Sequence, residues 1–213
     1  MIKGIIFDLD GVIVDTARFH YQAWKRLAKE LKFDFDQHDN ERLKGVSRMD
    51  SLNILLSIGG IRATEAEKKR YAAQKNQWFL EYIHQLTPQD VLPGVVPFLK
   101  KLQGTTIQTA LGSASKNARI ILKQLHLSHL FSVIVDGTMV QAAKPDPEVF
   151  LIAAKLMHLQ PSECLVFEDA IAGVIAAHRG GMQCIGVGDP KILSAADRVI
   201  PGFEKITMEM LEF

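Results

Sequence analysis

The chain has 213 residues, of which 47% are hydrophobic and 23% are charged, the balance of a globular protein rather than of a disordered one. Lysine and arginine together number 25 and aspartate and glutamate 24, so the formal net charge is +1. This balance provides no field that favours nucleic acid or an anionic membrane as a partner, and any phosphate site must be local.

The first predicted element is a strand over residues 2–7. Gly4 interrupts this apolar run and acids follow it, so the start lacks the continuous apolar stretch of a secretory signal. No other stretch approaches the roughly 18 apolar residues of a membrane span.

Two aspartates follow the first strand, with one apolar residue between them. Asp8 and Asp10 share a face if the chain is extended, about 6.6 Å apart, while Leu9 points into the packing. That separation suits two carboxylates that flank one reacting atom, and Gly11 lets the chain turn away. The same residues also serve simply to end a strand, so this motif alone leaves both interpretations open.

A helical insert is predicted over residues 16–87, which contain no convincing strand. Apolar residues recur every four positions over Phe19–Leu31, which indicates an amphipathic helix over residues 17–31. The same pattern predicts helices over residues 41–57 and 64–85. We therefore expect a small helical bundle.

The insert joins the rest of the chain at two neighbouring segments, near Asp15 and near Thr87-Pro88. Two such connections favour a hinge. We expect two domains, one formed by residues 1–15 and 88–213 and the other by residues 16–87.

Four further apolar runs, alternating with helical patterns, follow the insert. They cover residues 106–111, 131–135, 164–167 and 183–187. The alternation predicts an α/β fold, with a parallel sheet and helices on both faces. Ligands collect at the carboxyl ends of such strands, so the polar residues after each run are the candidates for a site.

Hydroxyl and amide side chains follow the second run, in the sequence Gly112-Ser113-Ala114-Ser115-Lys116-Asn117. A helix is predicted next, over residues 118–127. Its free N–H groups, together with these side chains, suit a phosphoryl group. Ser and Asn at this point are equally typical of a helix cap, so the signal is weak alone.

Lys144 follows the third run, just outside a helix that Asp146 is expected to cap with Pro147 in its first turn. A lysine held there would neutralise an anionic oxygen.

A second acidic pair, Glu168-Asp169, follows the fourth run. Four carboxylates at two strand ends repel one another unless a cation lies among them. Oxygen ligands without paired His or Cys point to Mg²⁺ rather than to zinc or copper.

Two cysteines, Cys164 and Cys184, lie within apolar stretches. They are interpreted as small core residues of a reduced, cytoplasmic protein rather than as a disulfide. Nothing in the sequence demands a partner chain, so we expect a monomer.

Taken in this order, the four motifs resemble those of the haloacid dehalogenase superfamily of phosphotransferases. They are Asp8-Leu9-Asp10-Gly11, Ser113, Lys144 and Glu168-Asp169. The resemblance covers the whole chain and implies a Rossmann-like catalytic core with an inserted helical cap domain. It also implies that Asp8 is a nucleophile that forms an aspartyl phosphate and that Asp10 gives and takes a proton.

The resemblance further implies ligands for the phosphoryl group and for the metal. Ser113 and Lys144 would hold the remaining phosphoryl oxygens. Mg²⁺ would be held by Asp8, the backbone carbonyl of Asp10, Glu168 and Asp169.

A second set of segments is more specific: Leu43–Arg48, His20 and Lys75-Asn76 of the insert, with Gly11-Val12, Asp15-Thr16 and Ser113–Asn117. Together these segments resemble the β-phosphoglucomutase family within this superfamily. The resemblance implies that substrate is bound by Lys44, Gly45, Val46, Ser47, Arg48, Ser115, Lys75 and Asn76. Arg48 offers a planar bidentate fork for a second, distal phosphate, with Lys116 and Asn117 nearby on the core side. Thr16 and His20 would assist at the hinge, His20 by sensing closure through Lys75.

Three hypotheses of function remain. The first is a mutase that interconverts β-glucose 1-phosphate and glucose 6-phosphate through β-glucose 1,6-bisphosphate. The second is a sugar-phosphate phosphatase of the same superfamily, and the third is a sugar-phosphate binding module without turnover. The third is opposed by four intact residues, Asp8, Asp10, Lys144 and Asp169. The segment Lys44–Arg48 argues against the second.

Overall fold

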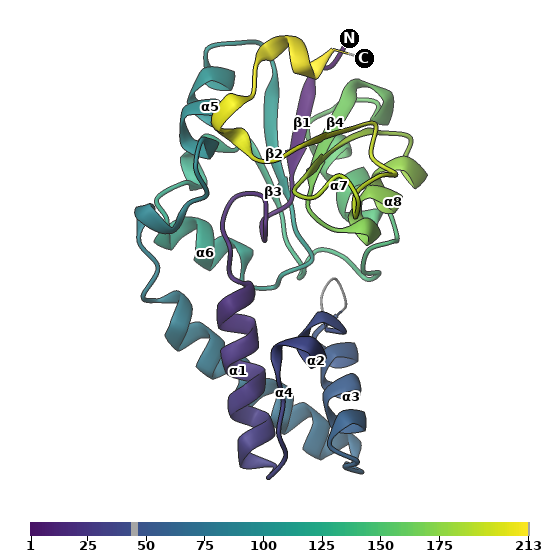
Figure 1. Ribbon diagram of the computed structural model, residues 1–213. Coiled ribbons are helices and arrows are strands. Elements are labelled where there is room, and N and C mark those ends of the chain that lie inside the picture. Colours follow the sequence, from purple (N-terminus) through teal and green to yellow (C-terminus); the bar gives the residue numbers. More distant parts are fainter. Residues whose placement is uncertain (44–46, 213) are drawn as a thin grey trace. The chain divides into compact units, whose positions relative to one another are not determined.

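The computed structural model describes residues 1–43 and 47–212 (Figure 1). The chain divides into two compact units. Met1–Asp15 and Thr87–Phe213 form the first, which we call the core unit, and Thr16–Leu86 form the second, the insert unit.

A six-stranded parallel sheet forms the centre of the core unit, in the order β3-β2-β1-β4-β5-β6. The strands are β1 (Gly4–Phe7), β2 (Gln108–Gly112), β3 (Val133–Val135), β4 (Cys164–Glu168), β5 (Gln183–Val187) and β6 (Arg198–Ile200). The predicted α/β fold with a parallel sheet is confirmed. The edge strand β6 was not predicted, because its sequence, Arg198-Val199-Ile200, has only two apolar residues in a row after a charged one.

Helices cover both faces of this sheet (Figure 1). They are α5 (Val95–Gln103), α6 (Ala118–Gln124), α7 (Glu148–Leu156) and α8 (Ile171–Arg179). Single turns of 3₁₀ helix cover Pro88–Asp90, Ser128–Leu130, Pro161–Glu163, Phe203–Lys205 and Met208–Leu211.

Alternate residues of each strand pack against opposite helical layers. Ile6 and Val166 belong to one buried cluster with residues of α7 and α8. Phe7 and Phe167 point to the other face, where their rings stack with centroids 5.2 Å apart and both meet Phe98 of α5 edge-on. Burial on both sides explains why the strands are continuously apolar.

The strand register determines which residues meet at the carboxyl edge of the sheet. Phe7 pairs with Leu111 on one side and with Phe167 on the other. The next residues, Asp8 and Glu168, therefore leave the sheet side by side, and the N–H of Asp8 donates to the carbonyl of Phe167 at 2.9 Å.

The insert unit is helical, and its described residues contain no strand. Its helices are α1 (Ala17–Glu30), α2 (Gln37–Glu41), α3 (Arg48–Ile58) and α4 (Glu65–Ile83). The expectation of one helix over residues 41–57 is wrong. α2 ends at Glu41, and α3 has its own start, where the Ser47 hydroxyl accepts the Asp50 N–H at 3.2 Å.

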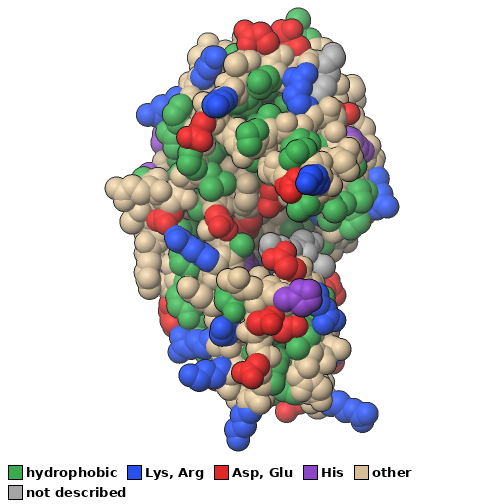
Figure 2. Space-filling view, viewed as in Figure 1, with side chains coloured by type: hydrophobic (Ala, Val, Ile, Leu, Met, Phe, Trp, Pro, Cys, Tyr) green, Lys and Arg blue, Asp and Glu red, His purple; other side chains and the backbone are tan. Residues whose placement is uncertain are grey.

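Charges of both signs are interspersed over the described residues of the face shown in Figure 2, as the net charge of +1 leads one to expect. No helix among the described residues has both the length and the apolar composition that crossing a membrane requires. Cys164 and Cys184 are buried and free, as predicted.

Candidate active site

The carboxyl ends of β1 and β4 place two carboxylates around one lysine. Lys144 Nζ donates to Asp8 Oδ1 and to Glu168 Oε1, both at 2.5 Å. The three side chains are 8%, 11% and 2% exposed, respectively. Lys144 also lies over the ring of Phe150, 4.6 Å from its centroid. The sequence placed these residues at separate strand ends, and the fold brings them into direct contact.

The electrostatics of this group follow from its burial. Removal from water raises the pKa of Asp8 to about 7, and the nearby charge of Glu168 adds to the rise, while Lys144 opposes it. Burial by itself lowers the pKa of Lys144, but the attraction of Asp8 and Glu168 outweighs it, so the pKa is raised. Lys144 is therefore a fixed cation that partly compensates a surplus of negative charge.

Glycines leave room for Glu168, the last residue of β4, and for Asp169, which follows it. Glu168 Oε2 accepts the N–H of Ala170 at 2.8 Å, beside the start of α8. A Cβ on Gly173 would lie 1.9 Å from the Glu168 carboxyl carbon, so only glycine leaves room for that carboxylate. A Cβ on Gly11 would likewise lie 2.0 Å from Asp169 Oδ2, and Gly11 has φ of +76°.

Asp169 and Asp10 belong to the same crowded group. Loss of hydration raises the pKa of Asp169, and the charges of Asp8, Glu168 and Asp10 raise it further. Asp169 is exposed and Asp10 is half-buried, so both stand at the solvent side of the cluster, whereas Asp8 and Glu168 lie inside it.

The polar segment after β2 folds into a compact turn. The N–H of Ser115 donates to Ser113 Oγ at 3.1 Å, and the N–H of Asn117 donates to Ser115 Oγ at 3.2 Å. Ser113 and Asn117 are buried, while Lys116 is exposed. The helix that follows ends at Gln124 rather than at residue 127, because the chain takes a left-handed turn at His126, with φ of 57°.

The helix after Lys144 also begins later than predicted. α7 begins at Glu148, one residue after Pro147, and Asp146 Oδ1 accepts the N–H of Glu148 at 2.9 Å. The predicted capping by Asp146 thus takes place with the start shifted by one residue.

The insert unit has a polar group of its own. Lys75 Nζ lies 2.8 Å from His20 Nδ1, over the faces of Trp24 and Phe79 at 4.6 and 4.8 Å from their centroids. Lys75 is only 2% exposed. Burial lowers the pKa of His20 well below its usual value, and the positive charges of Lys75 and Arg48 lower it further, so the imidazole is neutral.

The other candidates of the insert unit differ in their surroundings. Arg48 is half-buried, and this burial lowers its pKa. Ser47 serves as the cap of α3, Thr16 is buried, and Asn76 is half-buried on α4. Lys44, Gly45 and Val46 lie outside the described residues.

One buried acid, Asp136, was missed in the sequence. It follows β3 directly, is 3% exposed, and binds Arg119 and Thr138. Inspection of the first polar residue after each run, the rule that singled out Asp8 and Glu168, would have found it.

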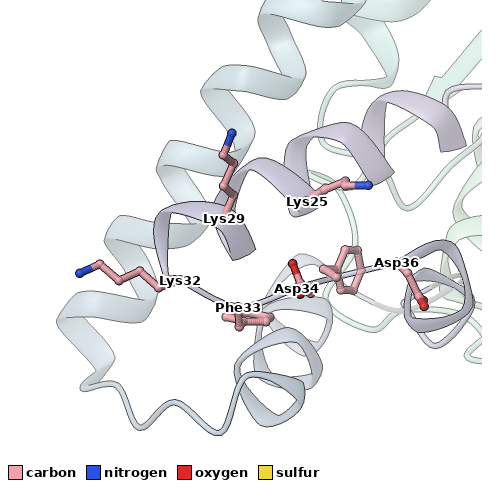
Figure 3. Close-up of a pocket in the computed structure, with 7 residues that line it drawn as sticks. Lys25, Lys29, Lys32, Phe33, Asp34 and Asp36 are labelled. Carbon is pink, nitrogen blue, oxygen red and sulfur yellow. The ribbon is translucent and has the colours of Figure 1, made fainter.

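A surface cavity of about 540 Å³ lies wholly within the insert unit (Figure 3). Its lining residues are Lys25, Lys29, Lys32, Phe33, Asp34, Phe35 and Asp36. Three lysines and two aspartates leave little net charge, and none of these residues is a candidate from the sequence. The cavity therefore contributes nothing to the site.

Comparison with known proteins places this chain in a family. Residues 2–181 match the haloacid dehalogenase-like hydrolase family, and the chain belongs to it. Within that family it is 42% identical over 212 residues to a β-phosphoglucomutase of Bacillus subtilis, covering 99% of this chain and 94% of the relative. A phosphorylated carbohydrates phosphatase of Thermotoga maritima is 30% identical over 187 residues, which are 86% of this chain and 84% of the relative.

The fold agrees with these relationships. The crystal structure of β-phosphoglucomutase from Clostridium difficile superposes with a TM-score of 0.94 and 40% identity, covering 100% of this chain and 96% of that one. The predicted resemblance to the haloacid dehalogenase superfamily is thus confirmed.

Membership of this family implies a divalent metal cofactor, and the donor chemistry fits one. Among the described residues, no three His, Cys, Asp or Glu side chains converge closely enough to hold a metal ion. The carboxylates of Asp8, Glu168 and Asp169 nevertheless provide oxygen donors of the kind that hard cations prefer. Burial, together with the repulsion among these carboxylates, raises the pKa of Asp8 and Asp169, and a divalent cation bound there would offset that repulsion.

Proposed function

We propose that this protein is a Mg²⁺-dependent β-phosphoglucomutase, which interconverts β-glucose 1-phosphate and glucose 6-phosphate through β-glucose 1,6-bisphosphate. The core unit is the catalytic domain in this proposal, and the insert unit is a cap. The 42% identity to the Bacillus subtilis β-phosphoglucomutase carries the proposal, because it exceeds the 30% shared with the Thermotoga maritima phosphatase and covers nearly the whole chain.

The proposed chemistry begins at Asp8. One of its oxygens forms a bond to phosphorus, the bond from phosphorus to the sugar oxygen breaks, and the electron pair leaves with that sugar oxygen. Asp10 gives that oxygen a proton, and in the opposite step it takes the proton of the attacking sugar hydroxyl. Ser113 and Lys144 hold the remaining phosphoryl oxygens. The 2.5 Å contact between Lys144 and Asp8 supports this role.

Asp8, Glu168, Asp169 and the backbone carbonyl of Asp10 are the ligands that we propose for Mg²⁺. When bound, the ion supplies the positive charge that lets a carboxylate approach a phosphate dianion. Lys144 alone supplies one positive charge to this group, which supports the need for a further cation.

The insert unit recognises the sugar phosphate in this proposal. A bisphosphate has a second phosphate that does not react, so a mutase needs a second anion site. Arg48 is the residue proposed for it, with Lys116 and Asn117 on the core unit. Lys44–Ser47, Ser115, Lys75 and Asn76 complete the substrate site, and Thr16 and His20 assist at the hinge.

One assay distinguishes the mutase from its rivals. Purified protein receives β-glucose 1-phosphate, Mg²⁺ and a trace of the bisphosphate, and both glucose 6-phosphate and free phosphate are measured. We expect glucose 6-phosphate to predominate, and the Asp8→Asn variant to form neither product because an amide is not a nucleophile. Predominance of free phosphate contradicts the mutase and favours a phosphatase, whereas absence of both products favours a binding module.

We also propose that the protein works as a monomer in the cytoplasm. Cys164 and Cys184 are buried free thiols, which supports a reducing compartment. Size-exclusion chromatography with light scattering tests the monomer, for which we expect a mass near 23.7 kDa.

A further inference from the structure

Asp136 is a buried carboxylate to which the proposed reaction gives no part. Its Oδ2 accepts the Nε–H of Arg119 at 2.7 Å, and its Oδ1 accepts both the N–H of Thr138 at 2.9 Å and the hydroxyl of Thr138 at 2.5 Å. Burial alone raises its pKa, but these hydrogen bonds outweigh that effect and hold the pKa below its usual value. Asp136 is therefore an ionised carboxylate at the carboxyl end of β3, and both of its oxygens accept hydrogen bonds.

The backbone on both sides of Asp136 is joined to the turn that carries Ser113. The N–H of Ser113 donates to the carbonyl of Val135 at 3.0 Å, and the N–H of Gly137 donates to the carbonyl of Ser115 at 3.1 Å. A Cβ on Gly137 would lie 2.1 Å from the carbonyl oxygen of Ala114, so the two segments touch through their backbones.

Arg119 strengthens the same junction from α6. Besides its bond to Asp136, its guanidinium donates to the carbonyl of Ile134 at 2.6 Å. The helix that follows the Ser113–Asn117 turn is thus tied to β3 at two points.

Asp136 is also the first residue of the loop that ends at Lys144. Thr138 is held by Asp136, and further along Glu148 Oε2 accepts the N–H groups of Gln141 and Ala142 at 2.8 and 2.7 Å. Carboxylates thus bind the loop near both of its ends, and Lys144 lies just beyond the second attachment.

We propose that Asp136 is a positioning residue, which holds the Ser113–Asn117 turn and the Lys144 loop at the separation that one phosphoryl group requires. The inference rests on the function proposed above. Ser113 and Lys144 come from different strands, and Asp136 connects the segments that carry them. A misplacement of about 1 Å costs on the order of 100-fold in rate, so the loss of this connection is felt in phosphoryl transfer.

Asp197 offers a matched control in the same unit. Its Oδ2 accepts the N–H of Cys184 at 2.7 Å and lies 2.9 Å from His178 Nε2, so it also links a helix to a strand, and its pKa is also lowered. It borders none of the residues proposed for the reaction. Asp136→Asn and Asp197→Asn each remove one hydrogen-bonded charge, from a side chain that is 4% exposed at Asp136 and 36% exposed at Asp197.

The test uses acetyl phosphate as donor, which requires no sugar. An oxygen of Asp8 bonds to phosphorus as the bond to acetate breaks, acetate leaves with the electron pair, and the added mass is followed on the intact protein. We expect Asp136→Asn to slow this phosphorylation about tenfold to 100-fold and to raise the Kd for inorganic phosphate, measured by calorimetry. Asp197→Asn should change neither the phosphorylation rate nor the Kd for phosphate by more than about twofold. The melting temperature of each variant, measured in parallel, shows that it is folded under the assay conditions.

Arg119→Met provides a second variant in case Asp136→Asn does not fold. The Arg119 side chain is 54% exposed, and Thr138 continues to donate two hydrogen bonds to Asp136 in this variant, so we expect the same changes at smaller size. Equal phosphorylation rates and phosphate affinities in the Asp136, Asp197 and Arg119 variants would overturn the positioning role alone. Failure of the unsubstituted protein to accept phosphate on Asp8 would instead overturn the proposed function, and the positioning role with it.

Discussion

Each unit contains a buried lysine, and the two lysines differ in the side chains that contact them. In the core unit, Lys144 binds the carboxylates of Asp8 and Glu168. In the insert unit, Lys75 lies against the neutral imidazole of His20 and over two aromatic rings. The core unit thus gathers negative charge that requires cations, whereas the insert unit gathers positive charge around a histidine that stays unprotonated. The first suits a metal and a nucleophile, and the second suits recognition of an anion.

The largest effect is expected when Lys144 is removed. Lys144→Met leaves two buried carboxylates without their cation, and breaking a buried pair in this way costs about 3–5 kcal/mol of stability. Phosphoryl transfer should disappear as well. Urea unfolding followed by circular dichroism measures the loss.

An exposed pair in the same unit provides the control. Lys3 Nζ donates to Glu163 Oε1 at 2.6 Å, almost the same distance, but the lysine side chain is 58% exposed. Lys3→Met should therefore have a much smaller effect. If the two variants lose equal stability, burial does not distinguish the two lysines, and the description of the core unit as a site short of positive charge is wrong.

A second prediction separates the proposed roles of the two units. Arg48→Ala should lower kcat/KM for isomerisation about 10- to 100-fold, the value of a lost charge-assisted hydrogen bond, while hydrolysis of a small ester such as p-nitrophenyl phosphate changes little. Arg48→Lys retains the charge but lacks the planar fork, so its kcat/KM for isomerisation should lie between those of the unsubstituted protein and of Arg48→Ala. Equal losses in both reactions would contradict a role for Arg48 at a distal phosphate.

The sequence was most informative where the strand ends bring residues together. Runs of apolar residues located five of the six strands, and parallel topology then placed Asp8, Lys144 and Glu168 at one edge. What the pattern did not reveal is that Lys144 binds both carboxylates directly, because this contact depends on the path of the loop over residues 136–144, which has no periodicity.

The insert was less predictable, for a physical reason. Helical periodicity marks α1 and α4 clearly, but the apolar pattern over residues 41–57 continues across a break that only the cap at Ser47 signals. The buried contact of Lys75 with His20 joins residues 55 positions apart, and it depends on how α1 packs on α4. Periodicity in the sequence shows which face of a helix is buried, but it does not show which other helix packs against that face.

A third prediction concerns the space reserved for Glu168. Gly173→Ala would place a Cβ 1.9 Å from the carboxyl carbon, so the carboxylate must shift or the helix must move, at a cost of about 1–3 kcal/mol. We expect the Mg²⁺ concentration for half-maximal activity to rise about tenfold. Gly180→Ala is the matched control, because its nearest atoms lie 3.3 Å away. Equal metal requirements in the two variants would show that Glu168 needs no such space.

The smallest expected effect concerns His20 and the pH. Because its pKa is lowered in the folded protein by burial, Lys75 and Arg48, the unfolded chain takes up the proton first as the pH falls through the usual histidine range. The stability that a neutral His20 contributes is therefore present near pH 7 and is lost as the pH falls toward 5. His20→Asn retains an oxygen near the position of Nδ1 but does not titrate, so its stability should depend less on pH. Urea unfolding at both pH values measures the difference, and an NMR titration that shows His20 gaining a proton at its usual pKa would contradict the neutral imidazole.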